Sequence, residues 1–255
     1  MAVARYLFRQ ILSKHIANYT GQLFCYKVKY SIFASNLTVM SIEANLLEIK
    51  NSLPKGVTLV AISKTHPPES IMEAYNAGQR VFGENKVQEL VSKYEALPRD
   101  IEWHLVGHLQ SNKVKYVVPF VRLIHSVDSL KLLVAIDREA QRVNRVVDCL
   151  LQIHIASEET KFGLSADELE QLLGDEEYGL LQHIRVVGLM GMATFTENME
   201  QVRTEFRFLR QLFERIRDKH FTGKSWFCEL SMGMSSDYRI AVEEGSTMVR
   251  IGSSI

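Results

Sequence analysis

The sequence predicts an α/β protein built as a single (β/α)8 TIM barrel. Eight short apolar runs, bounded by polar or glycine-containing segments, alternate with amphipathic stretches of helical periodicity. Apolar strands separated by helices are typical of a parallel sheet that is buried on both faces. No linker rich in Pro, Gly or Ser interrupts the series, and the 255 residues match the roughly 250 that one such barrel needs.

The predicted strands recur at short intervals along the chain. Each is rich in aliphatic and β-branched residues, as in VTLVAI at 57–62. Polar or glycine residues follow nearly every run, as Ser-Lys-Thr follows the first. The eight predicted strands are residues 57–62, 80–85, 101–107, 122–127, 147–155, 184–190, 226–231 and 247–252.

The predicted helices carry their own start and stop signals. Pro67 and Gly78 bracket the first of them, and Pro119 ends the short third one. Ser165 and Glu168 have the spacing of a capping box. The helices predicted between the strands are residues 67–78, 86–97, 111–119, 128–143, 165–174, 199–220 and 237–245.

No helix follows the last predicted strand, so the barrel lacks its eighth outer helix. Ser41 can cap an additional N-terminal helix that carries Glu43 near its positive end. This helix can occupy the gap. We therefore predict one barrel domain of residues 40–255, preceded by an irregular N-terminal extension of residues 1–39.

The first 42 residues hold five basic residues and no acidic one. That composition resembles an organelle transit peptide, but it lacks the apolar core of a secretory signal. No window of about 18 apolar residues predicts a membrane span. We favour a folded protein that starts near Met40 and resides in the cytoplasm. Three widely spaced cysteines without a CxxC motif fit that reducing compartment and predict neither a disulfide framework nor a zinc site.

The overall composition excludes several classes of protein. The chain contains 30 basic and 30 acidic residues, and 46% of its residues are apolar. A disordered chain would have low hydrophobicity and a high net charge. A nucleic-acid-binding protein would show a basic excess, so no nucleic-acid partner is predicted.

Lys64 is the strongest candidate for a reactive side chain in the sequence. It stands just beyond the first predicted strand, where functional groups of a barrel gather. An apolar barrel mouth disfavours the charged lysine, which makes the amine a nucleophile for carbonyls and allows a Schiff base. The alternative is a strand-end lysine that simply reaches solvent. Lys161 in EETKFG is the second candidate for the Schiff base.

Two glycine- and serine-containing loops follow strands seven and eight, the usual phosphate site of barrels. Gly252 and Ser253 follow the last strand, while Gly233 and Ser235 follow the one before, and Ser235 or Ser236 is expected to cap the next helix. Arg250 lies two residues before Gly252 and shares its side of the strand. A lysine, a phosphate cradle and a cation together predict a pocket for pyridoxal 5'-phosphate. An ion pair with Glu229 is the alternative for Arg250.

Further residues at the strand ends are weaker candidates. Asn85 and His104 can hydrogen-bond the edge of the cofactor, or each can be a satisfied polar residue inside the barrel. Met190 and Met232, in GLMGM and LSMGM, can pack against its ring or within the core. His104 and His108 have HxxxH spacing but no third ligand at a motif spacing, so no metal site is predicted.

Eight motifs in the chain resemble those of a known protein family. In order, they are LVAISKT, FGENKVQEL, WHLVGHLQSNK, HSVDS, EETKFG, GLMGM, LSMGMSSDYRIAV and VRIGS. From about Met40 to Ile255 they resemble the pyridoxal phosphate homeostasis protein family, also described as the YggS/PROSC family. The resemblance implies a fold-type III barrel like the N-terminal domain of alanine racemase, with pyridoxal phosphate on Lys64 and Arg250 near its pyridine nitrogen. It also implies phosphate contacts from Ser231, Ser235, Gly252 and Ser253.

Three functions remain as hypotheses. The first, also implied by the resemblance, is a monomer without turnover that stores, buffers or delivers the cofactor, with amino acids and cofactor-dependent apo-enzymes as partners. The second is an amino-acid racemase or decarboxylase using the same cofactor. A racemase of this fold type has a second domain, and the barrel leaves no residues for one. The third is a Schiff-base aldolase without cofactor.

Overall fold

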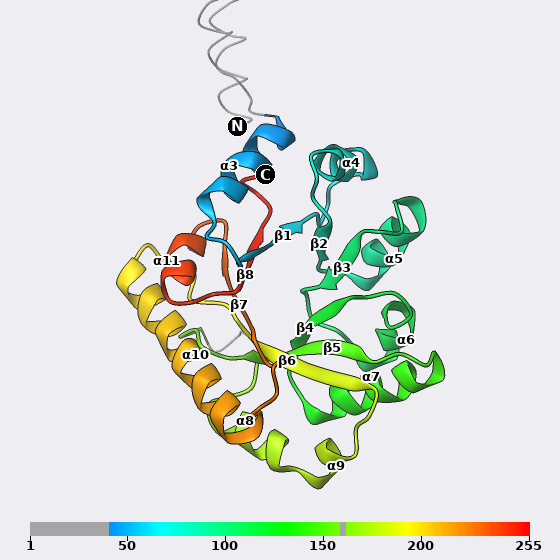
Figure 1. Cartoon of the computed structure of the whole chain (residues 1–255), viewed down its shortest axis with the longest axis vertical. Coiled ribbons are helices and arrows are strands. Elements are labelled where there is room, and N and C mark those ends of the chain that lie inside the picture. The colour runs from blue at the N-terminus through cyan, green and yellow to red at the C-terminus, as the bar shows by residue number, and fades with distance from the viewer. Residues whose placement is uncertain (1–40, 159–161) are drawn as a thin grey trace, which may run out of the picture. The chain divides into compact units, whose positions relative to one another are not determined.

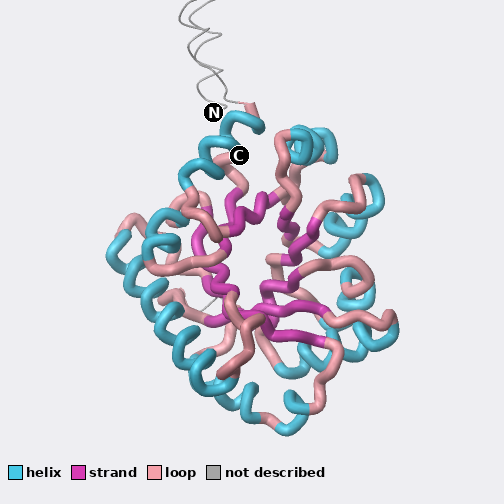
Figure 2. The backbone as a smooth tube through the Cα atoms, in the orientation of Figure 1, coloured by secondary structure: helices cyan, strands magenta, loops and turns pink. Residues whose placement is uncertain are grey.

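The computed structural model describes residues 41–158 and 162–255, and residues 42–255 form one compact unit. Within it the eight strands close into a barrel in which each pairs in parallel with its sequence neighbours and β1 pairs with β8 (Figures 1 and 2). The prediction of a TIM barrel is confirmed. The strands are β1 Thr58–Ile62, β2 Val81–Glu84, β3 Glu102–Leu105, β4 Leu123–Val127, β5 Val147–Ile153, β6 Ile184–Gly191, β7 Glu229–Met234 and β8 Met248–Ile251.

Helices surround this ring of strands, as the tube in Figure 2 shows. The Ser165 side chain accepts from the amide of Glu168, whose carboxylate accepts from the Ser165 amide, so the predicted capping box is present. The helices are α3 Ile42–Ser52, α4 Pro68–Asn76, α5 Val87–Ala96, η1 Ser111–Lys113, α6 Val114–Val117, α7 Leu130–Arg142, α8 Ala166–Gly174, α9 Glu176–Gly179, α10 Met199–His220 and α11 Tyr238–Glu243. None of these helices is long and apolar enough to cross a membrane.

Two apolar clusters stabilise the barrel. The larger one fills the space between the strands and the helices, and the smaller one fills the lumen. Because side chains alternate along a strand, β1, β4, β5, β6 and β8 supply buried residues to both clusters. The lumen cluster consists of Val60, Leu123, Leu150, Val187, Met190 and Met248.

Helix α3 lies beside β8, where the eighth outer helix would stand (Figure 1). Its Leu46 and Ile49 side chains are buried in the larger cluster. The Asn45 amide donates to the carbonyl of Ile255 at 3.2 Å, and the Ser52 and Tyr238 hydroxyls are also 3.2 Å apart. These contacts support the expected role of the additional helix. The predicted extension of residues 1–39 lies outside the described residues.

The strand predicted at 226–231 was placed three residues too early, because β7 runs from Glu229 to Met234. The aromatic residues suggested a strand, but Phe227 stacks on Phe213 and Phe221, with ring centroids 5.0 and 4.1 Å apart. It therefore belongs to the approach loop. The helix predicted at 111–119 is split between η1 and α6, and the single-turn helix α9 was not predicted.

Candidate functional site

Lys64 follows β1 at the end of the barrel where all eight strands have their carboxyl ends. Its neighbours Val60 and Ile62 pack in the lumen cluster, so the alternation of the strand, continued by two residues, carries Lys64 toward the lumen opening. The side chain is exposed. The next residue, Thr65, has a φ of 65°, a left-handed conformation that is rare for a β-branched residue. Such a conformation persists only where the surroundings fix it.

A buried ammonium group fixes the loop that carries Lys64. The Lys93 Nζ donates to the Ser63 carbonyl at 2.7 Å, immediately before Lys64. It also contacts carboxylate oxygens of Glu84 at 2.6 Å and Glu89 at 2.7 Å. One lysine of α5 therefore joins the end of β1 to the end of β2.

Lys93, Glu84 and Glu89 form a clamp on the loop of Lys64, because the two carboxylates also accept hydrogen bonds from that loop. Glu89 accepts from the Thr65 amide at 2.5 Å, just after Lys64, and Glu84 accepts from the Ser63 hydroxyl at 2.6 Å. Burial raises the pKa of Glu84, although hydrogen bonds from Lys93 and Ser63 oppose the shift. Its Oε2 is buried and has no hydrogen-bond partner in the described part of the chain. The loop with Lys64 is thus held on both sides by charged hydrogen bonds.

Arg250 lies inside the lumen. Its strand partner is Val60, a lumen residue, and only 5% of its surface is exposed. It donates to Ser231 Oγ at 2.6 Å and to the Gly191 carbonyl at 3.0 Å, both neutral oxygens. Burial lowers the pKa of Arg250 to about 10, although the negative charge of Asp237 acts to raise it. The guanidinium therefore stays charged at neutral pH.

A chain of hydrogen bonds continues from Arg250 across the lumen. Ser231 Oγ lies 3.1 Å from His125 Nδ1, and His125 Nε2 lies 3.0 Å from His104 Nδ1. Burial lowers the pKa of His104 to about 3, with a further lowering from Arg122, and burial also lowers the pKa of His125 far below its ordinary value. Both imidazoles are neutral. Each donates one proton and accepts one, so the chain can be satisfied in either direction.

The loops after β7 and β8 touch each other. The Gly252 amide donates to Ser235 Oγ at 3.4 Å, while Ser253 is exposed beside them. A Cβ on Gly252 would lie 2.9 Å from the Ile62 carbonyl, so glycine lets the β8 loop approach the end of β1. The groups expected to hold a phosphate therefore adjoin the strand that leads to Lys64.

One detail of this prediction was wrong. Neither Ser235 nor Ser236 caps α11, because Asp237 occupies the N-cap position and its carboxylate accepts from the Met234 amide at 2.5 Å. Gly233 has a φ of +94°, and a Cβ there would meet the Cβ of Ala241 at 2.6 Å, so β7 must turn tightly before it reaches α11. The Ser235 hydroxyl is instead directed to the β8 loop.

The remaining candidates lie at different depths. Asn85 is half-buried just after β2, at the same end as Lys64. Met190 packs in the lumen cluster, whereas Met232 packs in the larger cluster between strands and helices. The structure therefore places the Met232 side chain away from the other candidates. Lys161, the second candidate for the Schiff base, lies outside the described residues.

Sequence reasoning missed two parts of this arrangement. His125, within the HSVDS motif, is not among the predicted site residues, although it alternates with Leu123 on the lumen side of β4. Lys93 was not noted at all. It falls within the apolar stripe of α5, three residues after Leu90, and a lysine in such a stripe signals a buried partner.

The chain matches known proteins over most of its length. The family model described as "Alanine racemase, N-terminal domain" matches residues 38–255. A pyridoxal phosphate homeostasis protein of Aquifex aeolicus is 46% identical over 196 residues, covering 76% of this chain and 83% of that protein. The protein of the same name from Schizosaccharomyces pombe is 35% identical over 204 residues, covering 79% of this chain and 84% of the relative.

Solved structures agree with the sequence relatives. PipY of Synechococcus elongatus, solved with PLP bound, has a TM-score of 0.76 and 37% identity, covering 84% of this chain and 98% of that one. An alanine racemase of Clostridium difficile has a TM-score of 0.65 at 14% identity, covering 84% of this chain and 56% of its own, which shows the shared fold alone. The chain therefore belongs to the pyridoxal phosphate homeostasis protein family, whose barrel corresponds to the N-terminal domain of alanine racemase.

Proposed function

We propose that this protein binds pyridoxal 5'-phosphate at the carboxyl end of its barrel and serves the intracellular homeostasis of that cofactor. The observation that carries the proposal is the gathering of three groups at this end and in the lumen beneath it. These are the loop of Lys64, the joined loops of Ser235 and Gly252, and the buried cation of Arg250. PipY, a relative that is 37% identical, was solved with this cofactor bound.

The donor set fits the chemical groups of the cofactor. Its aldehyde reacts reversibly with amines, and Lys64 is an exposed amine on a fixed loop. Its phosphate needs hydroxyl and amide donors, which Ser235, Gly252 and Ser253 offer at the neighbouring loops. Its ring nitrogen is an acceptor, and Arg250 is a buried donor.

The protein's own residues favour holding the cofactor over turning over substrates. Arg250 disfavours a proton on a nearby ring nitrogen, because that proton would bring two cations together. A racemase needs an acid and a base on opposite faces of its substrate, and Lys64 supplies only one of them. His104 and His125 are buried, and each bonds to a partner in the lumen. We therefore infer a monomeric, cytoplasmic carrier that exchanges the cofactor with amino acids or apo-enzymes and has no rapid turnover.

Borohydride trapping tests the binding proposal. The protein is incubated with pyridoxal phosphate, reduced and digested, and we expect the label on Lys64. The Lys64→Ala variant should lose both the label and the visible absorbance, while its circular dichroism stays unchanged. Lys86→Ala, which alters an exposed lysine after β2, is the matched control. A label that persists in Lys64→Ala would refute the assignment, and its mass-mapped position would then show whether Lys161 is used.

Chiral chromatography tests the absence of turnover. Loaded protein incubated with alanine, serine and lysine should leave each enantiomer unconverted while its absorbance spectrum changes as the amine binds. Conversion at about 1 per second or faster, an enzyme-like rate, would establish a racemase instead. Visible absorbance from bound cofactor would also contradict the aldolase hypothesis, which uses none.

A further inference from the structure

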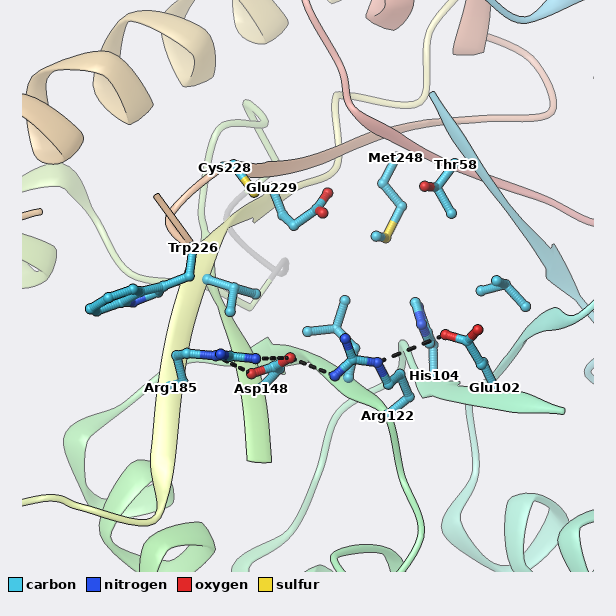
Figure 3. A pocket seen from close by; sticks show the side chains of 13 residues that line it. Thr58, Glu102, His104, Arg122, Asp148, Arg185, Trp226, Cys228, Glu229 and Met248 are labelled. Atoms are coloured by element: carbon cyan, nitrogen blue, oxygen red, sulfur yellow. Dashed lines mark hydrogen bonds and ion pairs between the residues drawn. The ribbon is translucent and has the colours of Figure 1, made fainter. Parts of the chain in front are cut away.

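A cavity of about 430 Å³ opens at the other end of the barrel, where the strands begin (Figure 3). Each of the eight strands contributes its first or second residue to the lining. The volume is within the range of small-molecule sites. The lining includes Leu123, Asp148, Arg185, Val187, Glu229 and Met248, with Arg122 just before β4 and Trp226 before β7.

The floor of this cavity is largely apolar, with the His104 imidazole also in the lining. Leu123, Val187 and Met248 line it and also belong to the lumen cluster, so the cavity ends on the packed interior of the barrel. Trp226 stands at its edge with 39% of its surface exposed. An occupant would therefore find aliphatic and aromatic surface as well as charge.

One wall carries two guanidinium groups and two carboxylates. The Asp148 carboxylate, with a side chain that is only 7% exposed, binds Arg185 through two hydrogen bonds of 2.7 and 2.9 Å. It also accepts from Arg122 at 2.7 Å. The two guanidinium groups share this single buried carboxylate, which fixes their orientation while their side chains remain 43% and 54% exposed. Arg122 also lies 3.8 Å from the half-exposed carboxylate of Glu102, a longer contact that leaves its guanidinium accessible.

The opposite wall carries an acidic group without a cation. Glu229 accepts from the Thr247 hydroxyl at 2.8 Å, and no basic side chain of residues 41–158 or 162–255 forms an ion pair with it. Figure 3 shows its carboxylate across the opening from the row formed by Arg185, Asp148 and Arg122. Two partly exposed guanidinium groups thus face, across a largely apolar floor, a carboxylate that has no ion pair among the described residues.

We propose that this cavity, the amino-terminal mouth of the barrel, binds a small zwitterion with a carboxylate, a protonated amine and an apolar body, as in an aliphatic amino acid. The carboxylate contacts Arg122 and Arg185, because guanidinium groups recognise carboxylates in a fixed geometry. The amine contacts Glu229, and the apolar body covers the floor. This site is separate from Lys64 and does not depend on the cofactor proposal.

Calorimetric titration of the full-length protein with L-leucine tests the site. Two probes of similar size each lack one charge: isocaproate has no amine, and isoamylamine has no carboxylate. We expect saturable binding of leucine, with each of the other probes at least about 10-fold weaker, because each lacks one hydrogen bond between charged groups. Equal affinity for all three would refute recognition of a zwitterion.

Single substitutions test where leucine binds. Glu229→Gln should weaken leucine binding by about 10-fold or more while isocaproate binding is unchanged, and Glu69→Gln on α4 is the matched control. Lys64→Ala should bind leucine normally, which separates this test from the cofactor test. Leucine binding that Lys64→Ala abolishes, that Glu229→Gln leaves unchanged, or that does not occur at millimolar concentration would overturn the proposal.

Discussion

The two ends of the barrel place charge in opposite ways. At the carboxyl end, the ammonium of Lys93 is buried together with Glu84 and holds the exposed loop that carries Lys64. At the amino end, the charged side chains of Arg122 and Arg185 are about half-exposed and share a buried acid. Buried charges are costly to leave unpaired, whereas exposed ones are screened by water. The carboxyl end therefore uses its ion pairs to fix a backbone loop, and the amino end keeps its charges accessible.

Removing one cation from each end should destabilise the protein to very different degrees. Lys93→Met leaves Glu84 buried without its partner and should lower the free energy of unfolding by about 3–5 kcal/mol. Arg122→Met removes a half-exposed group whose partner Asp148 keeps Arg185, so the loss should be below about 1 kcal/mol. Urea unfolding measures both.

The double variant Lys93→Met with Glu84→Gln provides the control. It should recover part of the lost stability, because it removes the stranded charge. If Arg122→Met proved as damaging as Lys93→Met, the contrast between the two ends would be broken.

Arg250 gives the next largest effect. Arg250→Ala should weaken pyridoxal phosphate binding by about 10- to 100-fold, and Arg250→Lys should weaken it less, because lysine keeps the charge but loses the planar fork of donors. Equilibrium dialysis measures the dissociation constants. Equal constants for both variants and the wild type would show that the cofactor does not contact this guanidinium.

The two lumen histidines predict a pH dependence of stability. Burial holds the pKa of His104 at about 3 in the folded protein, whereas an unfolded histidine titrates near ~6.5. Between these values the unfolded chain binds more protons, so stability is complete above ~6.5 and falls as the pH decreases toward 3. Each such histidine adds a slope of at most about 1.4 kcal/mol per pH unit.

Urea unfolding between about pH 7 and pH 5 measures this slope. His104→Gln should reduce this slope. An unchanged slope in His104→Gln would show that this imidazole takes up protons in the folded state.

The smallest effect is expected for the extension. We propose that residues 1–39 are dispensable and that a protein beginning at Met40 keeps the melting temperature and cofactor content of the full chain. A loss of about 1 kcal/mol would lower the melting temperature by roughly 2–4 °C. A decrease of that size in differential scanning calorimetry would refute the proposed domain boundary.

The barrel was predictable because its signals are local. Apolar runs, Pro67, Gly78 and the Ser165 capping box each specify an element from nearby residues. The Lys93 clamp was not predictable to the same degree. Its acceptors, the Ser63 carbonyl and Glu84, are 30 and 9 residues away in the sequence and meet Lys93 only when β1, β2 and α5 pack together. The early start assigned to β7 has another cause, since Trp226 and Phe227 have strand propensity but pack elsewhere.

The pairing of β1 with β8, from Thr58↔Met248 to Ala61↔Ile251, has a consequence for aggregation. A closed barrel has no edge strand open to another chain, and parting this seam would expose two edges at once. The loop of Lys64 and the loop of Gly252 lie on opposite sides of the seam. A cofactor that contacts both loops would link β1 to β8. Loaded protein should therefore resist the edge-to-edge association to which an opened barrel is prone.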